Sequence, residues 1–302
     1  MKHTRLDPDI KTPAGFGPPV RHSRAARLRR EVPNFISKNR GLLAKPAFWT
    51  LLPRLAALRG RSAAPASAVP TRFVATHHKV MTTYFTAVLR PLAFALKLPY
   101  QKVHSELPGA DARLVLSMHG KLDLAALGTY RGVHIMRDPR DMIVSGYHYH
   151  KWTHEEWVHR PDENGVSYQQ KLNRADKHDG LFMEIDHFIF FYRPTLQLWD
   201  MGDPDILEVA YEALMGPDRD QMYHAIFAHM GFDGAVLELA VDLMRLFEAK
   251  SRTGRKAGAV STGSHLRSGA SGQWQAELEP THIDYIEQEL GPVLRKFGYG
   301  AG

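Results

Sequence analysis

The chain has 302 residues, of which 44% are hydrophobic and 24% are charged. These values are ordinary for a globular protein, exclude global disorder, and suit a single α/β enzyme. The chain contains no cysteine, which excludes disulfides, thiolate metal sites and a cysteine nucleophile. With 39 Lys and Arg against 32 Asp and Glu, the formal charge of +7 favours an anionic ligand.

The N-terminal segment differs in composition from the rest of the chain. Residues 1–30 are rich in Pro, Gly and Arg and show no hydrophobic period, which predicts an arm without a core of its own. Residues 41–60 have the spacing of an amphipathic helix, and residues 61–70 read as a linker. We therefore expect a basic arm, helix and linker over 1–69 and a folded domain over 70–302.

The basic N-terminal stretch raises the question of a partner. It carries few aromatic residues that could stack on bases, so no nucleic acid is expected, while an acidic acceptor or a membrane surface stays open. The chain shows neither a transmembrane apolar run nor an apolar signal core, which predicts a cytoplasmic protein.

Short apolar runs bounded by polar loops predict buried strands, and the segments between them have helical spacing. The expected strands are 72–76, 114–118, 132–136 and 206–210, and the expected helices are 82–96, 140–153, 181–199, 218–231, 234–249 and 280–296. Strands that alternate with helices predict an α/β fold with a central parallel sheet flanked by helices. Segment 251–273 has no core pattern, which predicts a long loop that is either a binding lid or disordered.

The most informative run is Val133–His148, in which a strand ends at Arg137 and a helix follows the Asp138-Pro139 turn. Arg137 and Ser145 can converge on one phosphate near the helix start, where the helix dipole favours an anion. Alone, the pair could equally cap a strand and pack against a sheet. The run resembles the 3′-phosphate motif of sulfotransferases that use 3′-phosphoadenosine 5′-phosphosulfate (PAPS).

This resemblance implies a P-loop-like sulfotransferase fold, with PAPS as the sulfuryl donor. The family's 5′-phosphosulfate loop is similar to the run Ala75–Tyr84. In this run, Lys79, Thr82 and Thr83 match, and Tyr84 stands where a Trp stacks on adenine. His78, Val80 and Met81 replace Pro, Ser and Gly, and losing the Gly removes an easy route to a positive φ.

Further parts of the chain extend the resemblance. The run His265–Trp274 resembles the family's C-terminal basic loop. This resemblance implies that Arg267, Ser268 and Gly269 bind the cofactor, with Arg267 on the 3′-phosphate. Ser268 stands where the family has a Lys. Tyr211, in Tyr211–Leu214, would contact the adenine edge. Phe247 would close over the other adenine face, although a Phe in a helix core is the plainer interpretation.

Transfer to the acceptor needs a base that removes the acceptor's proton. His119, after the strand at 114–118, resembles the histidine that deprotonates the acceptor in cytosolic sulfotransferases, and an imidazole titrates near working pH. It could also be an ordinary loop histidine. Since helix 82–96 contains no Asp or Glu, His119 is our candidate, with Lys79 stabilising the departing phosphate oxygen.

Other interpretations stay open. His150 and His154 share a helical face, but no third ligand is evident, so no metal is expected. A P-loop kinase and an inactive PAPS-binding protein are the alternatives to a sulfotransferase. The acceptor, a small molecule or a glycan, cannot be identified from these residues, and neither can the oligomeric state.

Overall fold

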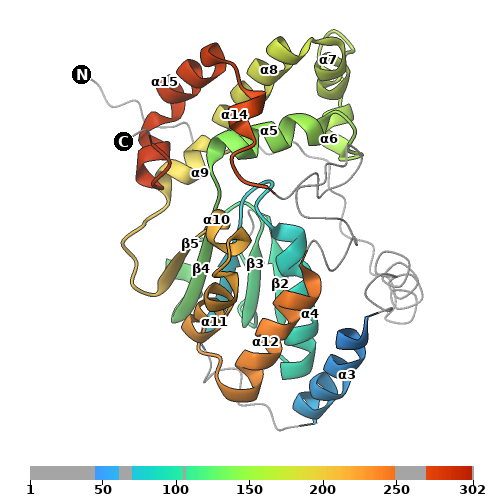
Figure 1. The fold of residues 1–302 in the computed structure, drawn as a ribbon, viewed down its shortest axis with the longest axis vertical. Helices are drawn as coiled ribbons and strands as arrows, with labels where there is room; N and C mark the ends of the chain where they lie inside the picture. The colour runs from blue at the N-terminus through green and yellow to red at the C-terminus, as the bar shows by residue number, and fades with distance from the viewer. Residues whose placement is uncertain (1–44, 61–69, 105–106, 249–269, 301–302) are drawn as a thin grey trace.

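A computed structural model describes residues 45–60, 70–104, 107–248 and 270–300. Its centre is a five-stranded parallel sheet in the order β2-β3-β1-β4-β5 (Figure 1). The strands are β1 (Thr71–Ala75), β2 (Tyr100–Val103), β3 (Leu114–Ser117), β4 (Tyr130–Met136) and β5 (Ile206–Ala210). The expected α/β class, the parallel sheet and four of the strands are confirmed. The edge strand β2 was not predicted, because its polar Gln101 and Lys102 hide the apolar pattern.

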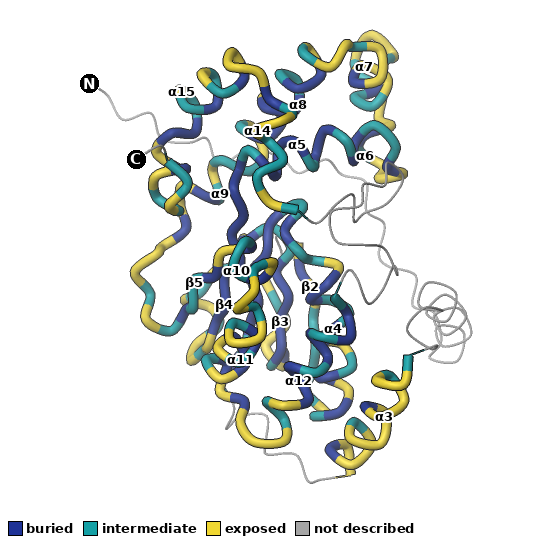
Figure 2. The backbone as a smooth tube through the Cα atoms, viewed as in Figure 1, coloured by how far each residue is buried: buried dark blue, intermediate teal, exposed yellow. Residues whose placement is uncertain are grey.

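Two faces of the sheet bury different sets of side chains, as the period of two along a strand requires. On one face, Val74, Leu116 and Ile135 belong to the main hydrophobic core. On the other face, Phe73 and Val115 belong to a smaller core. Figure 2 shows the sheet as the most continuously buried part of the chain.

The helices fall into two groups, as Figure 1 shows. Beside the sheet lie α4 (Thr82–Leu96), α10 (Tyr211–Met215), α11 (Arg219–His229) and α12 (Gly234–Phe247). Beyond the carboxyl ends of the strands lie α5 (Pro139–His150), α6 (Glu156–His159), α7 (Tyr168–Arg174), α8 (Lys177–Phe191), α9 (Arg193–Leu198), α14 (Trp274–Glu277) and α15 (Pro280–Lys296). A short 3₁₀ helix, η2 (Ala125–Leu127), precedes β4. Among the described residues, none of these helices has the length and apolar character needed to span a bilayer.

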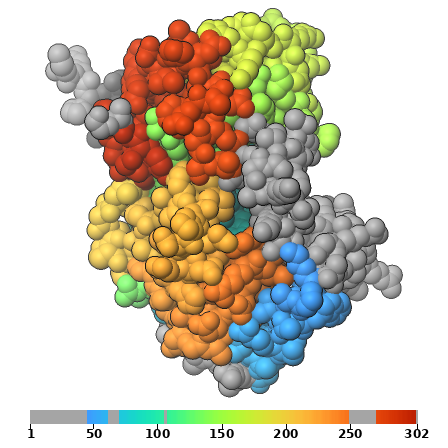
Figure 3. All heavy atoms as spheres, in the orientation of Figure 1, coloured from blue at the N-terminus to red at the C-terminus, as the bar shows by residue number. Residues whose placement is uncertain are grey.

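The helix α3 (Pro46–Arg59) packs against α4 and α12. Leu51 and Leu58 are buried in the main core, and Arg54 forms an ion pair of 2.5 Å with Asp242 on α12. In the space-filling view, α3 lies directly against α12 (Figure 3). The helix expected near 41–60 is therefore present, while the domain boundary at residue 70 stays a prediction.

Candidate active site

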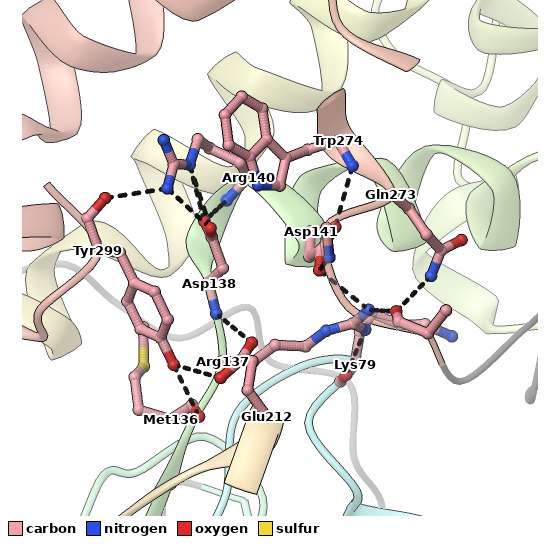
Figure 4. A network of polar contacts seen from close by, with 12 residues as sticks. Lys79, Met136, Arg137, Asp138, Arg140, Asp141, Glu212, Gln273, Trp274 and Tyr299 are labelled. Atoms are coloured by element: carbon pink, nitrogen blue, oxygen red, sulfur yellow. Dashed lines mark hydrogen bonds and ion pairs between the residues drawn. The ribbon is translucent and has the colours of Figure 1, made fainter. Parts of the chain in front are cut away.

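Arg137 lies at the carboxyl end of β4, where three segments of the chain meet (Figure 4). Its Nη1 atom donates to the carbonyl of Lys79 at 3.4 Å, and its Nη2 atom donates to the carbonyl of Ala270 at 3.0 Å. The guanidinium carbon lies 4.5 Å from the ring centre of Tyr211, the first residue of α10. The fold thus brings together Lys79, Arg137 and Tyr211 from the predicted set.

The start of α5 follows from its first residues. Asp138 is the N-cap and accepts a hydrogen bond from the main-chain N–H of Arg140, and Pro139 fits the first turn. The buried carboxylate of Asp141 accepts from the N–H groups of Gly272 at 2.7 Å and Trp274 at 3.0 Å. Asp141 therefore holds the C-terminal segment against the helix start. Sequence reasoning did not assign this function, because the partners lie far along the chain.

Arg140 forms the other half of this network, as Figure 4 shows. It pairs with Asp138 at 2.8 Å, donates to the carbonyl of Tyr299 at 2.9 Å, and stacks 3.9 Å from the ring centre of Trp274. The hydroxyl of Tyr299 donates to Glu212 at 2.7 Å. These contacts join the segment after α15 to the turn before α5.

The loop between β1 and α4 keeps a strained backbone. Lys79 and Met81 have φ values of 62° and 56°, in the left-handed region. A non-glycine residue there costs roughly 1–2 kcal/mol, and Met81 stands where the family pattern has Gly. The loop adopts this conformation without a glycine at position 81. The hydroxyl oxygen of Thr82, at the start of α4, lies 2.8 Å from the hydroxyl oxygen of Thr76, while Thr83 is exposed.

Lys79 is a cation in a confined position. Its Nζ atom lies 3.8 Å from the ring centre of Tyr149. Burial, and then the charge of Arg137, lower the pKa of Lys79 to about 8, although Glu155 and Glu184 oppose this change. A lysine of this kind is charged at neutral pH but gives up its proton in mild alkali.

The aromatic residues predicted around adenine have different surroundings. The hydroxyl of Tyr84 donates to the carbonyl of Met244 at 2.7 Å, and its ring is buried between α4 and α12. Phe247, the last residue of α12, is buried in the same core. Ser145 is half-buried in α5, two turns after Arg137. Arg267, Ser268 and Gly269, like most of the 251–273 segment, lie outside the described residues.

His119 lies two residues after the end of β3. Its ring lies 5.5 Å from that of His104 and stacks at 6.1 Å on Tyr192. Tyr192 also stacks on His78 at 5.4 Å. Burial, and then the charges of His150, Lys79 and other neighbours, lower the pKa of His78 well below its usual value. Tyr192 was not singled out in the sequence, because nothing local distinguishes it from other aromatic residues.

A hydrogen-bonded chain crosses the sheet beneath the loop. His77 Nε2 lies 2.7 Å from His134 Nε2, and His134 Nδ1 lies 2.5 Å from the carboxylate of Glu208. The indole N–H of Trp199 donates to Glu208 at 2.7 Å. Burial is the main cause that lowers the pKa values of His77 and His134. This hydrogen-bonded network joins the loop after β1 to strands β4 and β5, and it was not predicted.

The chain has similar solved structures and a matching family model. A search of curated proteins found no match. The mouse sulfotransferase SULT7A1 complexed with PAP has 15% identity and a TM-score of 0.48, over 80% of this chain and 89% of that one. Retinol dehydratase in complex with androsterone and inactive cofactor PAP has 15% identity and a TM-score of 0.47, over 89% and 95%. The family model described as the sulfotransferase domain matches residues 73–298, and the chain therefore belongs to this family.

Proposed function

We propose that this chain transfers a sulfuryl group from PAPS to the hydroxyl or amine of an acceptor in one in-line step. The observation that carries the proposal is the environment of Arg137. Its Nε atom is buried without a hydrogen-bond partner among the residues that the structure describes. Its Nη atoms donate to two main-chain carbonyls, and Nη2 also lies 3.6 Å from the carboxylate of Asp141. A buried guanidinium with an unused donor is suited to a phosphate.

The donor would lie across the carboxyl ends of the strands. Arg137 and Ser145 would bind its 3′-phosphate, and Arg267, Ser268 and Gly269 would add contacts from the C-terminal loop. Lys79, Thr82 and Thr83 would bind the phosphosulfate at the start of α4, where main-chain N–H groups favour an anion. Tyr84, Tyr211 and Phe247 would contact the adenine. Both proposed phosphate sites are supported by the contact that joins Arg137 to the Lys79 carbonyl.

In the reaction, the acceptor oxygen or nitrogen attacks sulfur while the bond from sulfur to the bridging phosphate oxygen breaks. The electron pair of that bond leaves with the phosphate oxygen, where Lys79 stabilises the negative charge. His119 accepts the proton that the acceptor loses. The step needs no external oxidant or reductant, since atoms and charge balance between donor, acceptor and His119.

The neighbours of His119 and Lys79 support these roles. His78 and His119 both stack on Tyr192, which supports a position for His119 beside the loop that carries Lys79. Tyr149 lies under the Lys79 ammonium group and limits its motion. Holding the reacting groups in place lowers the barrier by avoiding the entropy of an unrestrained encounter.

Calorimetric titration with 3′-phosphoadenosine 5′-phosphate (PAP), with ATP and NAD as controls, tests the donor. Incubation with radiolabelled PAPS and a panel of small-molecule and glycan acceptors then tests transfer. Selective PAP binding with label transfer is the expected result. Binding without transfer to any acceptor would favour an inactive PAPS-binding protein, and a preference for ATP would favour a kinase.

A further inference from the structure

A second group of polar side chains is buried between α5 and α8. Glu184 and His187 are three residues apart on α8 and therefore project from the same face, and His150 is the last residue of α5. One nitrogen of each imidazole and one oxygen of Glu184 all lie within 4.8 Å of one another. The exposed fraction is 0% for His150, 2% for Glu184 and 9% for His187. We call these three residues the α5–α8 cluster.

The packing around the α5–α8 cluster leaves space for the carboxylate. Gly146 lies one helical turn before His150 on α5, and a Cβ atom at this position would lie 2.3 Å from Oε1 of Glu184. The hydroxyl of Tyr168 donates to Oε2 of Glu184 at 2.9 Å. The carboxylate is therefore held in one orientation by its neighbours.

Hydrogen bonds within the α5–α8 cluster do not use all of its nitrogen atoms. His150 Nδ1 lies 2.9 Å from Glu184 Oε2. The Nε2 atoms of His150 and His187 are buried, and neither has a hydrogen-bond partner in the described part of the chain. A buried polar atom without a hydrogen-bond partner destabilises the folded protein. Two such atoms in one small group indicate a ligand that would use them.

Another set of the same residue types provides a comparison. His178, Glu279 and His282 also lie close enough to share an ion. There, the main-chain N–H of Glu279 donates to His282 Nδ1 at 3.0 Å, and His282 Nε2 lies 3.0 Å from the carbonyl of His178. Glu279 is exposed, and it caps the start of α15 with His282. This second set is explained by helix capping, whereas the α5–α8 cluster is not.

We propose that His150, Glu184 and His187 bind a divalent transition metal ion, with Zn²⁺ as the best fit. Two imidazoles and one carboxylate form a donor set that zinc uses in sites with an open fourth position. Zinc holds nitrogen and oxygen ligands at about 2.0–2.2 Å.

Such an ion would join α5 to α8 near the loop between β1 and α4, which carries Lys79. His78, the neighbour of Lys79, stacks on His150 with ring centres 5.0 Å apart. Tyr168 would orient Glu184 from outside the ligand set. The sequence offered only His150 and His154 on one helical face, and the third ligand was missing because Glu184 and His187 come from another helix. The inference goes beyond the proposed function and does not depend on it.

The test uses the full chain without a histidine tag, after removal of metal with a chelator. Zn²⁺ is titrated against a chromophoric competitor, and Co²⁺ is followed by its visible absorption. Wild type is expected to bind one equivalent. Glu184→Gln keeps the shape of the carboxylate, and His187→Phe keeps the ring that stacks on Trp157 at 4.7 Å. Each is expected to weaken binding by at least about tenfold.

His154→Gln and His178→Gln are the matched controls, since they change histidines outside the α5–α8 cluster, and both are expected to bind like wild type. Thermal unfolding with and without Zn²⁺ provides a second measurement on each variant, and only variants with the cluster intact should gain stability from the ion. Wild type that binds no equivalent of either metal would overturn the proposal. Loss of binding in His178→Gln with retention in Glu184→Gln would also overturn it. Neither readout requires sulfotransferase activity.

Discussion

The Nη2 atom of Arg137 lies 3.0 Å from the carbonyl oxygen of Ala270, although 133 positions separate the two residues in the chain. The contact joins the end of β4 to the segment that precedes α14. The carboxylate of Asp141 lies 3.6 Å from the same nitrogen and forms an ion pair with it. The Nε atom of Arg137 has no hydrogen-bond partner among the described residues, so the guanidinium keeps a donor for an anionic ligand.

Replacing Arg137 with Ala should weaken PAP binding by roughly 10- to 100-fold, because a charge-assisted hydrogen bond contributes about 1.5–3 kcal/mol. Arg137→Lys keeps the positive charge but loses the paired N–H donors of the guanidinium. Its affinity for PAP should therefore lie between the affinities of wild type and Arg137→Ala. Calorimetry measures both dissociation constants, and thermal unfolding checks that the variants fold. An unchanged dissociation constant for Arg137→Ala would remove this residue from the donor site.

His119→Ala should lower kcat by about 10²- to 10⁴-fold and leave PAP binding unchanged, because the base acts on the acceptor and not on the nucleotide. His104→Ala is the control, since this exposed residue lies 5.5 Å from His119, ring to ring, and has no assigned role. Steady-state kinetics and calorimetry make the comparison. Equal turnover in the His119 variant and wild type would require a different base.

The affinity of the unliganded protein for PAP should fall as pH rises through about 8. The pKa of Lys79 is lowered from 10.5 to about 8, mainly by burial, so the ammonium charge is present below this pH and is lost above it. Titrations from about pH 7 to about pH 9 would show the change. Lys79→Met should bind more weakly and show no such step. A step that persists in this variant would assign the titration to another group.

The free energy of unfolding should fall as the solution is acidified below about pH 6.5. Burial lowers the pKa values of His77, His78 and His134, and it lowers that of His187 to about 4. Each histidine is therefore neutral in the folded protein at a pH where the unfolded chain binds a proton. Stability is complete above the unfolded pKa and decreases below it.

Urea unfolding at a series of pH values, with a chelator present, measures this dependence. Each histidine contributes a slope of up to about 1.4 kcal/mol per pH unit between its two pKa values. His187→Phe removes one of the titrating groups and should give a shallower decrease between about pH 6.5 and about pH 4. A variant with the wild-type slope would show that His187 is not among the groups that destabilise the protein in acid.

Much of the fold could be predicted because its signals are local. The strands β1, β3, β4 and β5 are short apolar runs, and such runs are typical of parallel strands buried on both faces. The run around Arg137 and the loop around Lys79 carry their residues in contiguous order, so a family resemblance could be identified from them. The family model that spans residues 73–298 confirms that identification.

Tertiary structure decided the relationships between distant segments. Asp141 accepts hydrogen bonds from the N–H groups of Gly272 and Trp274, and His77 lies in hydrogen-bond contact with His134. The α5–α8 cluster combines residues from two helices. No local pattern predicts these contacts, because each depends on how separate elements pack. The sequence by itself determined most of the strands and helices and which residues carry charge. Only packing decided which of those residues are buried together, and burial is what shifts their pKa values and leaves polar atoms without partners.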